Sequence, residues 1–198
     1  MKKPAPRSYP RRLDLNGTAV DFRLMTADDS PALSQFMAEL PVHDLLFVRR
    51  NVSHPKVIKA WLDALGHSVT SLVAYDDDQL VGCSAVVVDS CSWSPHVGDL
   101  RILVAPQWRG HGLGRVLIRE CVNLAVDQGL EKLTVQMTVD QSAAINAFEK
   151  LGFQPESVLR NHVKDHDGHT YDLALLSLEV NELVARASGR GMATAMSD

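Results

Sequence analysis

The spacing of hydrophobic residues divides the middle of the chain into alternating strands and helices. Helical spacing follows cap-forming residues at Thr26 and Ser53, and it returns over residues 112–128 and around residues 144–151. Apolar runs of strand length fill the intervals, at residues 20–25, 69–75, 80–88, 97–104, 133–139, 155–163 and 170–178. The order strand, two helices, three strands, helix, strand, helix, two strands predicts an α/β fold, a mixed sheet with helices on both faces.

Turn-forming residues support these boundaries. The polar tetrad from Asp76 to Gln79 separates two of the predicted strands, which indicates an antiparallel hairpin. The pair Asp167-Gly168 separates the last two strands, and Gly129 stands where a helix typically ends.

The two ends of the chain differ from its middle. Five basic residues precede the first acidic one: Lys2, Lys3, Arg7, Arg11 and Arg12. Prolines interrupt the same segment, so we expect residues 1–19 to be a flexible basic arm rather than a binding element. Residues 20–180 are predicted to form one domain, and residues 181–198 a frayed C-terminal tail.

Composition narrows the class of protein. With 198 residues, 45% of them hydrophobic and 22% charged, the chain suits one globular domain. It has no long uncharged apolar run, so we expect no membrane partner. Its formal net charge of -4 includes the basic start, so the body is strongly acidic and a nucleic-acid partner is not expected. Cys83, Cys91 and Cys121 are widely spaced, which favours reduced thiols and a cytoplasmic location.

The most informative segment joins a predicted strand to the long predicted helix. It carries Gly110, Gly112 and Gly114 at alternate positions. Glycines let the backbone approach a ligand, and the first-turn N–H groups of the helix then point at it. Together with the helix dipole they form an anion site suited to a pyrophosphate, and Arg109 and Arg115 can add charge-assisted bonds.

Two well-known phosphate-binding loops do not fit this segment. A Walker loop needs Gly-Lys-Ser/Thr, whereas Arg115 and Val116 follow Gly114. A dinucleotide fingerprint needs glycine where Arg115 stands. A purely structural role stays open, in which the glycines only permit tight packing of the strand against the helix.

Two motifs resemble those of the GNAT superfamily of acyl-CoA-dependent N-acetyltransferases. The family's cofactor motif, Gln/Arg-x-x-Gly-x-Gly/Ala, is matched from Gln107 to Gly112, between a strand that ends Val-x-Pro and a long helix. A second signature, aromatic-Glu-Lys-Leu-Gly-Phe, is matched from Phe148 to Phe153. With the order of elements, the resemblance covers roughly residues 20–180.

The resemblance implies a seven-stranded sheet that is splayed at its middle, with acetyl-CoA between the fourth and fifth strands. It implies an enzyme in which an amine attacks the thioester directly. The implied cofactor-binding residues are Ile102, Leu103, Val104, Gln107, Arg109, Gly110, His111, Gly112, Leu113, Gly114, Arg115, Gln141 and Phe148. A backbone N–H near Val104 is implied as the donor to the developing oxyanion.

The chain departs from the family at two positions of the second motif. Phe148 stands where many members carry a tyrosine that protonates the leaving thiolate, and Gln141 stands where asparagine is common. A CoA thiol resembles a cysteine thiol, with a pKa of about 8.5, so its thiolate leaves tolerably well near neutral pH. Water or Tyr171 is left to supply the proton, although Tyr171 also suits a packing role in its strand.

Asp99 is the predicted general base, because family members often place an acidic residue upstream of the loop on this strand. The alternative is that Asp99 only pairs with Arg101 or begins the strand. His96 is a second candidate base, although its place next to Pro95 favours a surface loop.

Histidines and aspartates gather near the last predicted turn, where they could suggest a metal site: His162, Asp165, His166, Asp167 and His169. Their spacing favours a solvated loop, so we expect no metal. The acceptor amine is left open between α-amino groups, small-molecule amines and lysine, and so is a homodimer. Two other classes of function remain, an acyl-CoA-binding sensor without catalysis and an interaction domain without a nucleotide.

Overall fold

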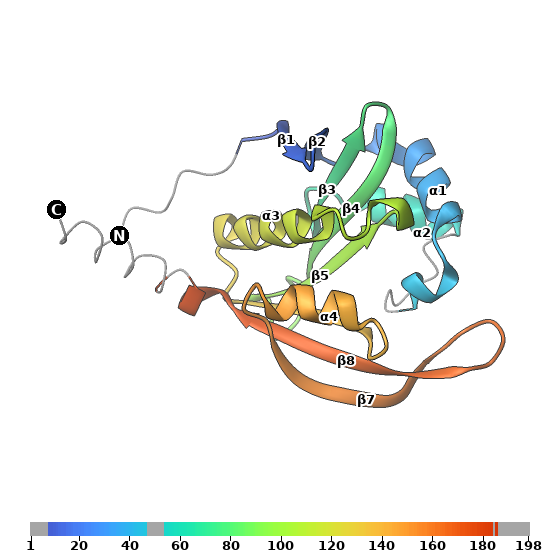
Figure 1. Cartoon of the computed structure of the whole chain (residues 1–198). Helices are drawn as coiled ribbons and strands as arrows, with labels where there is room; N and C mark the ends of the chain where they lie inside the picture. Colours follow the sequence, from blue (N-terminus) through green and yellow to red (C-terminus); the bar gives the residue numbers. More distant parts are fainter. Residues whose placement is uncertain (1–7, 47–53, 184, 186–198) are drawn as a thin grey trace.

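A computed structural model of the chain describes residues 8–46, 54–183 and 185. Over these residues it forms a single sheet of eight strands with four α-helices and three short 3-10 helices (Figure 1). The strands are β1 Arg11–Leu15, β2 Thr18–Leu24, β3 Val69–Asp76, β4 Gln79–Val88, β5 Val97–Val104, β6 Lys132–Thr138, β7 Gln154–Lys164 and β8 Thr170–Glu179. The helices are η1 Ala27–Asp29, α1 Ser30–Glu39, η2 Val42–Leu45, α2 Pro55–Asp63, η3 Pro106–Trp108, α3 Leu113–Gln128 and α4 Ser142–Glu149.

The strands lie in the order β1-β2-β3-β4-β5-β6-β8-β7. All neighbouring pairs are antiparallel except β5 and β6, which run parallel. A parallel pair requires a crossover connection, and α3 supplies it. The predicted hairpin around residues 76–79 and the predicted turn at residues 167–168 are both confirmed.

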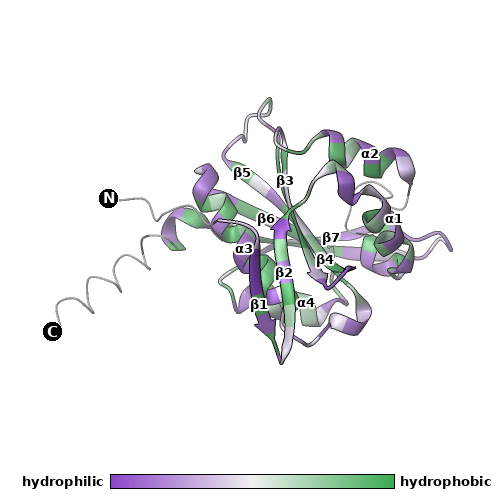
Figure 2. Ribbon diagram, turned by 90° about the horizontal axis from the view of Figure 1, so that it is seen from above, coloured by the Kyte–Doolittle hydropathy of each residue, from purple (hydrophilic) through white to green (hydrophobic). Residues whose placement is uncertain are grey.

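Helices cover both faces of the sheet, as the order of elements predicted (Figure 1). On one face α1 and α2 pack their apolar sides onto β3, β4 and the end of β5. On the other face α3 and α4 pack onto β4, β5, β6 and β8. Figure 2 shows that β1, at the edge of the sheet, begins with hydrophilic residues, while the strands between the helices carry many hydrophobic residues.

The expectation of a flexible arm over residues 1–19 is wrong for the described part beyond residue 10. Residues 11–15 form β1, which pairs antiparallel with β2 from Arg11 against Phe22 to Leu15 against Thr18. The basic residues had suggested an unstructured segment, but the side chains of Arg11 and Arg12 find acidic partners. Arg11 reaches the buried Glu120 of α3 at 2.7 Å, and Arg12 reaches Asp21 at 2.7 Å. The sheet therefore has eight strands instead of the seven expected.

Some expectations fall outside the described residues. The predicted cap Ser53 is one of them, and α2 begins at Pro55 with His54 as its N-cap. Most of the predicted tail, residues 181–198, also lies outside, although residues 181–183 are described as helical. No helix in the described ranges has the length and apolar character needed to cross a membrane.

A buried ionic network joins β2, β3 and the start of α1. Asp29, 2% exposed, accepts hydrogen bonds from the Arg23 guanidinium at 2.5 and 2.8 Å, the Thr26 amide at 2.8 Å and the Tyr75 hydroxyl at 2.8 Å. Burial raises the pKa of Asp29, but these four hydrogen bonds outweigh it and lower the pKa to about 2. The network therefore holds α1 against the sheet through an ionised carboxylate.

Replacing Asp29 by asparagine is expected to lower the free energy of unfolding by about 2–3 kcal/mol at pH 7. Because the pKa of Asp29 is depressed on folding, this contribution is present above about pH 4 and is lost as the pH falls toward 2. Urea denaturation of both proteins between pH 7 and pH 2.5 measures it. Asp63→Asn, which breaks an exposed pair with Lys59, is the control and should cost under about 1 kcal/mol. A pH-independent difference at Asp29 would contradict the assignment.

Candidate active site

The parallel strands β5 and β6 separate along their length. They pair from Val97 with Lys132 to Leu100 with Val135. Beyond this point β5 continues to Val104 and β6 to Thr138, and no register joins them, whereas β4 stays paired with β5 as far as Val104. This opening is the splay that the sequence predicted between its fourth and fifth strands, which are β5 and β6 once β1 is counted.

The backbone of β5 presents alternate residues to the opening. The Ala105 amide donates to the Val81 carbonyl of β4 at 2.9 Å. Because successive residues of a strand turn their N–H and C=O groups to opposite sides, Leu103 also faces β4. Ile102 and Val104 therefore turn their backbone groups toward the opening. Of the three β5 residues expected to bind a ligand by their backbone, Leu103 is the one that does not face it.

The glycine-rich loop lies at the end of β5 and adopts the backbone that its sequence implies. Gly110 has φ +77° and Gly112 has φ +91°, both in the left-handed region that favours glycine. Gly112 is the N-cap of α3, and no side chain caps the helix there. The amides of the first turn, at residues 113–115, thus lack intrahelical partners and point out of the helix end. This end of α3 suits an anion.

Packing does not explain these glycines. A Cβ atom at Gly110 or Gly112 would meet no atom within 4 Å, and one at Gly114 would meet only Val104 Cγ2, at 3.7 Å. The space over the loop is open, and the loop lies against the end of β5. The alternative that the glycines only permit tight packing therefore loses its support.

The loop also matches the cofactor motif in a second register. Arg109-x-x-Gly112-x-Gly114 has the same spacing as the match that begins at Gln107. In the second register the two glycines are the N-cap and the second residue of α3. Because three glycines alternate along the loop, both registers match the motif. Only the position where α3 begins distinguishes the two registers, so the sequence alone had indicated the first register.

Side chains of the loop are arranged around Arg109. The guanidinium of Arg109 forms an ion pair with Asp44 of η2. The His111 ring contacts the Arg109 carbonyl through Nδ1 at 2.9 Å and packs edge-on to Trp108 at 6.2 Å. Gln107 and Arg115 are exposed. His111 therefore shapes the loop by its side chain as well as its backbone.

The segment η2, between α1 and α2, contacts both sides of the opening. Asp44 contacts Arg109 on the β5 side. His43 Nε2 lies 2.8 Å from Asp140 Oδ2 and 3.3 Å from Thr138 Oγ1, on the β6 side. Sequence reasoning missed His43, Asp44, Thr138 and Asp140, because the partners are far apart along the chain and each is an ordinary polar residue on its own.

The predicted catalytic residues are not brought together. Asp99 lies where β5 and β6 are still paired, opposite Thr134, and its Oδ2 accepts two bonds from Arg101 at 3.0 and 3.1 Å. Tyr171 lies at the start of β8, where its hydroxyl donates to Asp165 at 2.9 Å. That hydrogen bond, with burial and nearby carboxylates, raises the pKa of Tyr171. A raised pKa makes the hydroxyl a weaker acid near neutral pH.

The two positions that depart from the family pattern lie at and near α4. Phe148 is 5% exposed and packs edge-on against Phe153 at a centroid distance of 5.0 Å. Its ring is therefore part of the core beneath α4. Gln141 is the N-cap of α4, but its side chain forms no capping hydrogen bond.

The histidines that the sequence singled out near the β7–β8 turn and before β5 lie among contacts that stabilise turns and loops. Asp165, Asp167 and His169 bring possible ligand atoms within 4.8 Å of one another. Asp165 already accepts the amides of residues 167 and 169 and the Tyr171 hydroxyl, so its carboxylate organises the β7–β8 turn. His96 lies in the exposed loop before β5, and its carbonyl accepts the Glu131 amide at 2.9 Å.

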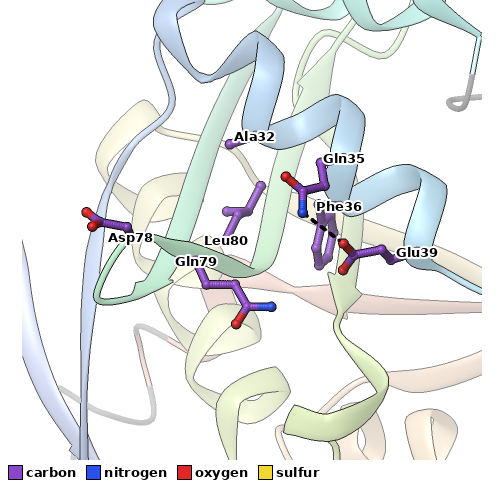
Figure 3. Close-up of a pocket in the computed structure, with 7 residues that line it drawn as sticks. All are labelled: Ala32, Gln35, Phe36, Glu39, Asp78, Gln79 and Leu80. Carbon is purple, nitrogen blue, oxygen red and sulfur yellow. Dashed lines mark hydrogen bonds between the residues drawn. The ribbon is translucent and has the colours of Figure 1, made fainter.

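A shallow cavity of about 290 Å³ lies between α1 and the turn from β3 to β4. Figure 3 shows Gln35 and Glu39 of α1, joined by a 3.0 Å hydrogen bond, above Gln79 and Leu80 at the start of β4. None of the residues that line this cavity belongs to the glycine-rich loop or to η2. It is separate from the opening between β5 and β6.

Two glycine substitutions separate backbone conformation from packing in the loop. Gly112→Ala places a side chain at φ +91° and is expected to lower the free energy of unfolding by about 1–2 kcal/mol. Gly114→Ala adds a methyl group inside α3 and is expected to be neutral or to stabilise by up to about 1 kcal/mol. Urea denaturation of the two variants checks this. Equal losses would show that close packing is what requires glycine.

Comparisons with known proteins agree with this geometry. Residues 35–153 match the model of the acetyltransferase (GNAT) family. The chain is 30% identical over 109 residues to an L-amino acid N-acetyltransferase of Escherichia coli, covering 53% of this chain and 66% of that protein. It is 35% identical over 77 residues to a streptothricin acetyltransferase of Streptomyces lavendulae, covering 39% of this chain and 40% of that protein.

The fold agrees as well. A spermidine N-acetyltransferase of Vibrio cholerae, solved in complex with CoA and spermine, superposes with a TM-score of 0.68 at 15% identity, covering 82% of this chain and 96% of that one. The alignments to the two curated relatives span about two fifths and two thirds of their lengths. The family model spans more than half of this chain, and its match contains the loop, η2 and β6. The chain belongs to the GNAT family of acetyltransferases.

Proposed function

We propose that this protein is an N-acetyltransferase that moves an acetyl group from acetyl-CoA to an amine. The observation that carries the proposal is the opening between β5 and β6 with an uncapped, glycine-rich helix start at its end. The first feature offers strand backbone to the amides of a pantetheine arm. The second offers helix amides to a pyrophosphate.

The pantetheine arm would lie along the open edge of β5. Ile102 and Val104 supply the backbone groups that face it, whereas Leu103 turns its backbone to β4 and buries its side chain in the core with α1 and α2. The pyrophosphate would take the loop amides, with Arg109 and Arg115 adding charge. The remaining predicted contacts are Gln107, Gly110, His111, Gly112, Leu113, Gly114, Gln141 and Phe148.

The reaction would be direct. The neutral amine attacks the thioester carbonyl, the new C–N bond forms, and the C–S bond breaks to release CoA. Holding both reactants in one opening can supply about 7–11 kcal/mol in favourable cases. A backbone N–H of β5 aimed at the oxyanion is worth about 3–4 kcal/mol in comparable sites.

The acceptor is inferred only as far as the amine class. The compared proteins are named for an L-amino acid, for streptothricin and for spermidine, so their names do not converge on one acceptor. The acidic body of the chain suits a cationic acceptor and disfavours a nucleic acid. An α-amino group, with a pKa of about 7.7–8.0, is roughly a tenth neutral at pH 7, so such amines need the least help from a base.

A second function has one observation in its favour. Phe148, at the family's acid position, has no proton to donate and is buried against Phe153. An acyl-CoA sensor that lost catalysis would show the same feature. It would bind acetyl-CoA but would not release CoA when an amine is present.

Two measurements on the wild-type protein separate these functions. Release of free CoA thiol from acetyl-CoA is followed across amino acids, polyamines and peptides, and thermal stability is measured with acetyl-CoA alone. We expect stabilisation by acetyl-CoA and thiol release with at least one amine class. Stabilisation without release would favour the sensor, and the absence of both signals would contradict the cofactor site itself.

Arg109→Ala is expected to weaken acetyl-CoA binding about tenfold, because it removes a charge-assisted hydrogen bond to the pyrophosphate. Isothermal titration with acetyl-CoA measures the change. Arg12→Ala is the matched control, since Arg12 pairs with Asp21 at the edge of the sheet, where its side chain is 61% exposed. Equal affinities of the two variants would contradict the placement of the pyrophosphate.

A further inference from the structure

His43 is held at the mouth of the opening by contacts from two strands. Its Nε2 lies 2.8 Å from the Asp140 carboxylate and 3.3 Å from the Thr138 hydroxyl, just beyond and at the end of β6. Its ring packs edge-on against Tyr171 of β8 at a centroid distance of 5.0 Å. Asp44, the next residue, is paired with Arg109 across the opening. The imidazole therefore has a fixed position at the mouth of the opening proposed to hold the pantetheine arm.

The contact with Asp140 also fixes which ring nitrogen is basic. An ionised carboxylate only accepts hydrogen bonds, so Nε2 must carry the proton that it donates to Asp140. In the neutral ring Nδ1 then has the free lone pair. Among the described residues none forms a hydrogen bond with Nδ1, and the side chain is 33% exposed, so an incoming amine can reach it.

The charges around the imidazole favour a cationic acceptor. Asp140 faces it from the turn after β6, and Asp165 lies behind Tyr171 in the β7–β8 turn, where His169 approaches Asp165. Burial raises the pKa of Asp140, but the Thr138 hydroxyl, a backbone amide and His43 outweigh it and lower that pKa, so Asp140 is ionised at neutral pH. The carboxylates that face the ring thus attract an ammonium group.

Asp99 lacks these properties. Its carboxylate is held by Arg101 through two hydrogen bonds. It also lies five residues before Val104, about 16 Å along an extended strand, on the part of β5 that is still paired with β6. A base at Asp99 would therefore have to act through bridging water, across the part of the sheet where β5 and β6 are still hydrogen-bonded.

We propose that His43, oriented by Asp140, is the general base of the acetyl transfer. Nδ1 takes one proton from the acceptor's ammonium group, and the resulting neutral amine attacks the thioester carbonyl. As the C–S bond breaks, the proton shed by the new amide nitrogen passes to the CoA thiolate, and the imidazolium returns its proton to solvent. This assignment rests on the proposed acetyl transfer.

The test compares His43→Gln and Asp140→Asn with wild type, using acetyl-CoA and the best amine of the panel. We expect His43→Gln to lower kcat/KM about 10²-fold or more. It should also remove the rise of kcat/KM that an imidazole base produces between about pH 5 and 8. The affinity for acetyl-CoA should change less than about twofold, because neither residue faces the glycine-rich loop. Asp140→Asn keeps the imidazole but removes the carboxylate that orients it, so kcat/KM should fall although the affinity for acetyl-CoA is kept.

His67→Gln is the matched control, an exposed histidine in the turn before β3, at the opposite end of the sheet. It should keep wild-type rates. Activity of His43→Gln within about threefold of wild type, with the pH rise unchanged, would overturn the proposal. So would loss of the rise in Asp99→Asn alone.

The failure of this inference differs from the failure of the proposed function. A wild type that binds acetyl-CoA but acetylates no amine overturns both. A wild type with turnover that His43→Gln leaves intact overturns only the role of His43. Should His43→Gln fail to fold, the fall of kcat/KM in Asp140→Asn at unchanged affinity for acetyl-CoA decides the matter, and an unchanged kcat/KM counts against the proposal.

Discussion

The hydrogen-bonding between β5 and β6 runs from Val97 to Leu100 and then stops, and the site exists because of this interruption. The paired half is closely packed. A Cβ atom at Gly98 would come within 2.9 Å of Leu130 and Leu133, so the two strands and the loop before β6 are pressed together there. The other half keeps its pairing with β4 and loses β6. One side of the end of β5 is therefore unpaired, although β5 lies inside the sheet and not at its border.

The segment η2 spans the gap that this separation leaves. One residue contacts the loop after β5, and its neighbour contacts the end of β6. These are polar contacts of partly exposed side chains, which contribute little stability individually. Their value is geometric, since they place a short segment from the layer of α1 and α2 across the mouth of the opening. The regions proposed for the cofactor and for the acceptor are thereby built from elements of opposite faces of the sheet.

Much of the fold was predictable because its signals are local. Apolar runs of strand length predicted β3, β4, β5 and β6 to within one residue at each end, and Gly129 marked the end of α3. The strand β1 was missed because a basic, proline-containing segment resembles a flexible arm until Glu120, over a hundred residues away, is seen to accept Arg11. The glycine-rich loop was recognised from its glycines, and its place before α3 is confirmed. The contacts of His43 with Asp140 and Thr138 were not predicted, because an imidazole and a carboxylate far apart along the chain leave no pattern in a single sequence.

The orientation of the β5 backbone has a consequence for how such a protein can change over evolutionary time. Recognition by main-chain atoms places no demand on the identity of the side chains at residues 102 and 104, provided that the strand remains a strand. Substitutions can accumulate along it while the groups that face the opening stay where they are. On the proposed function, a chain of this kind can diverge far in sequence and still bind the same acyl donor, because the groups that face the donor belong to the main chain.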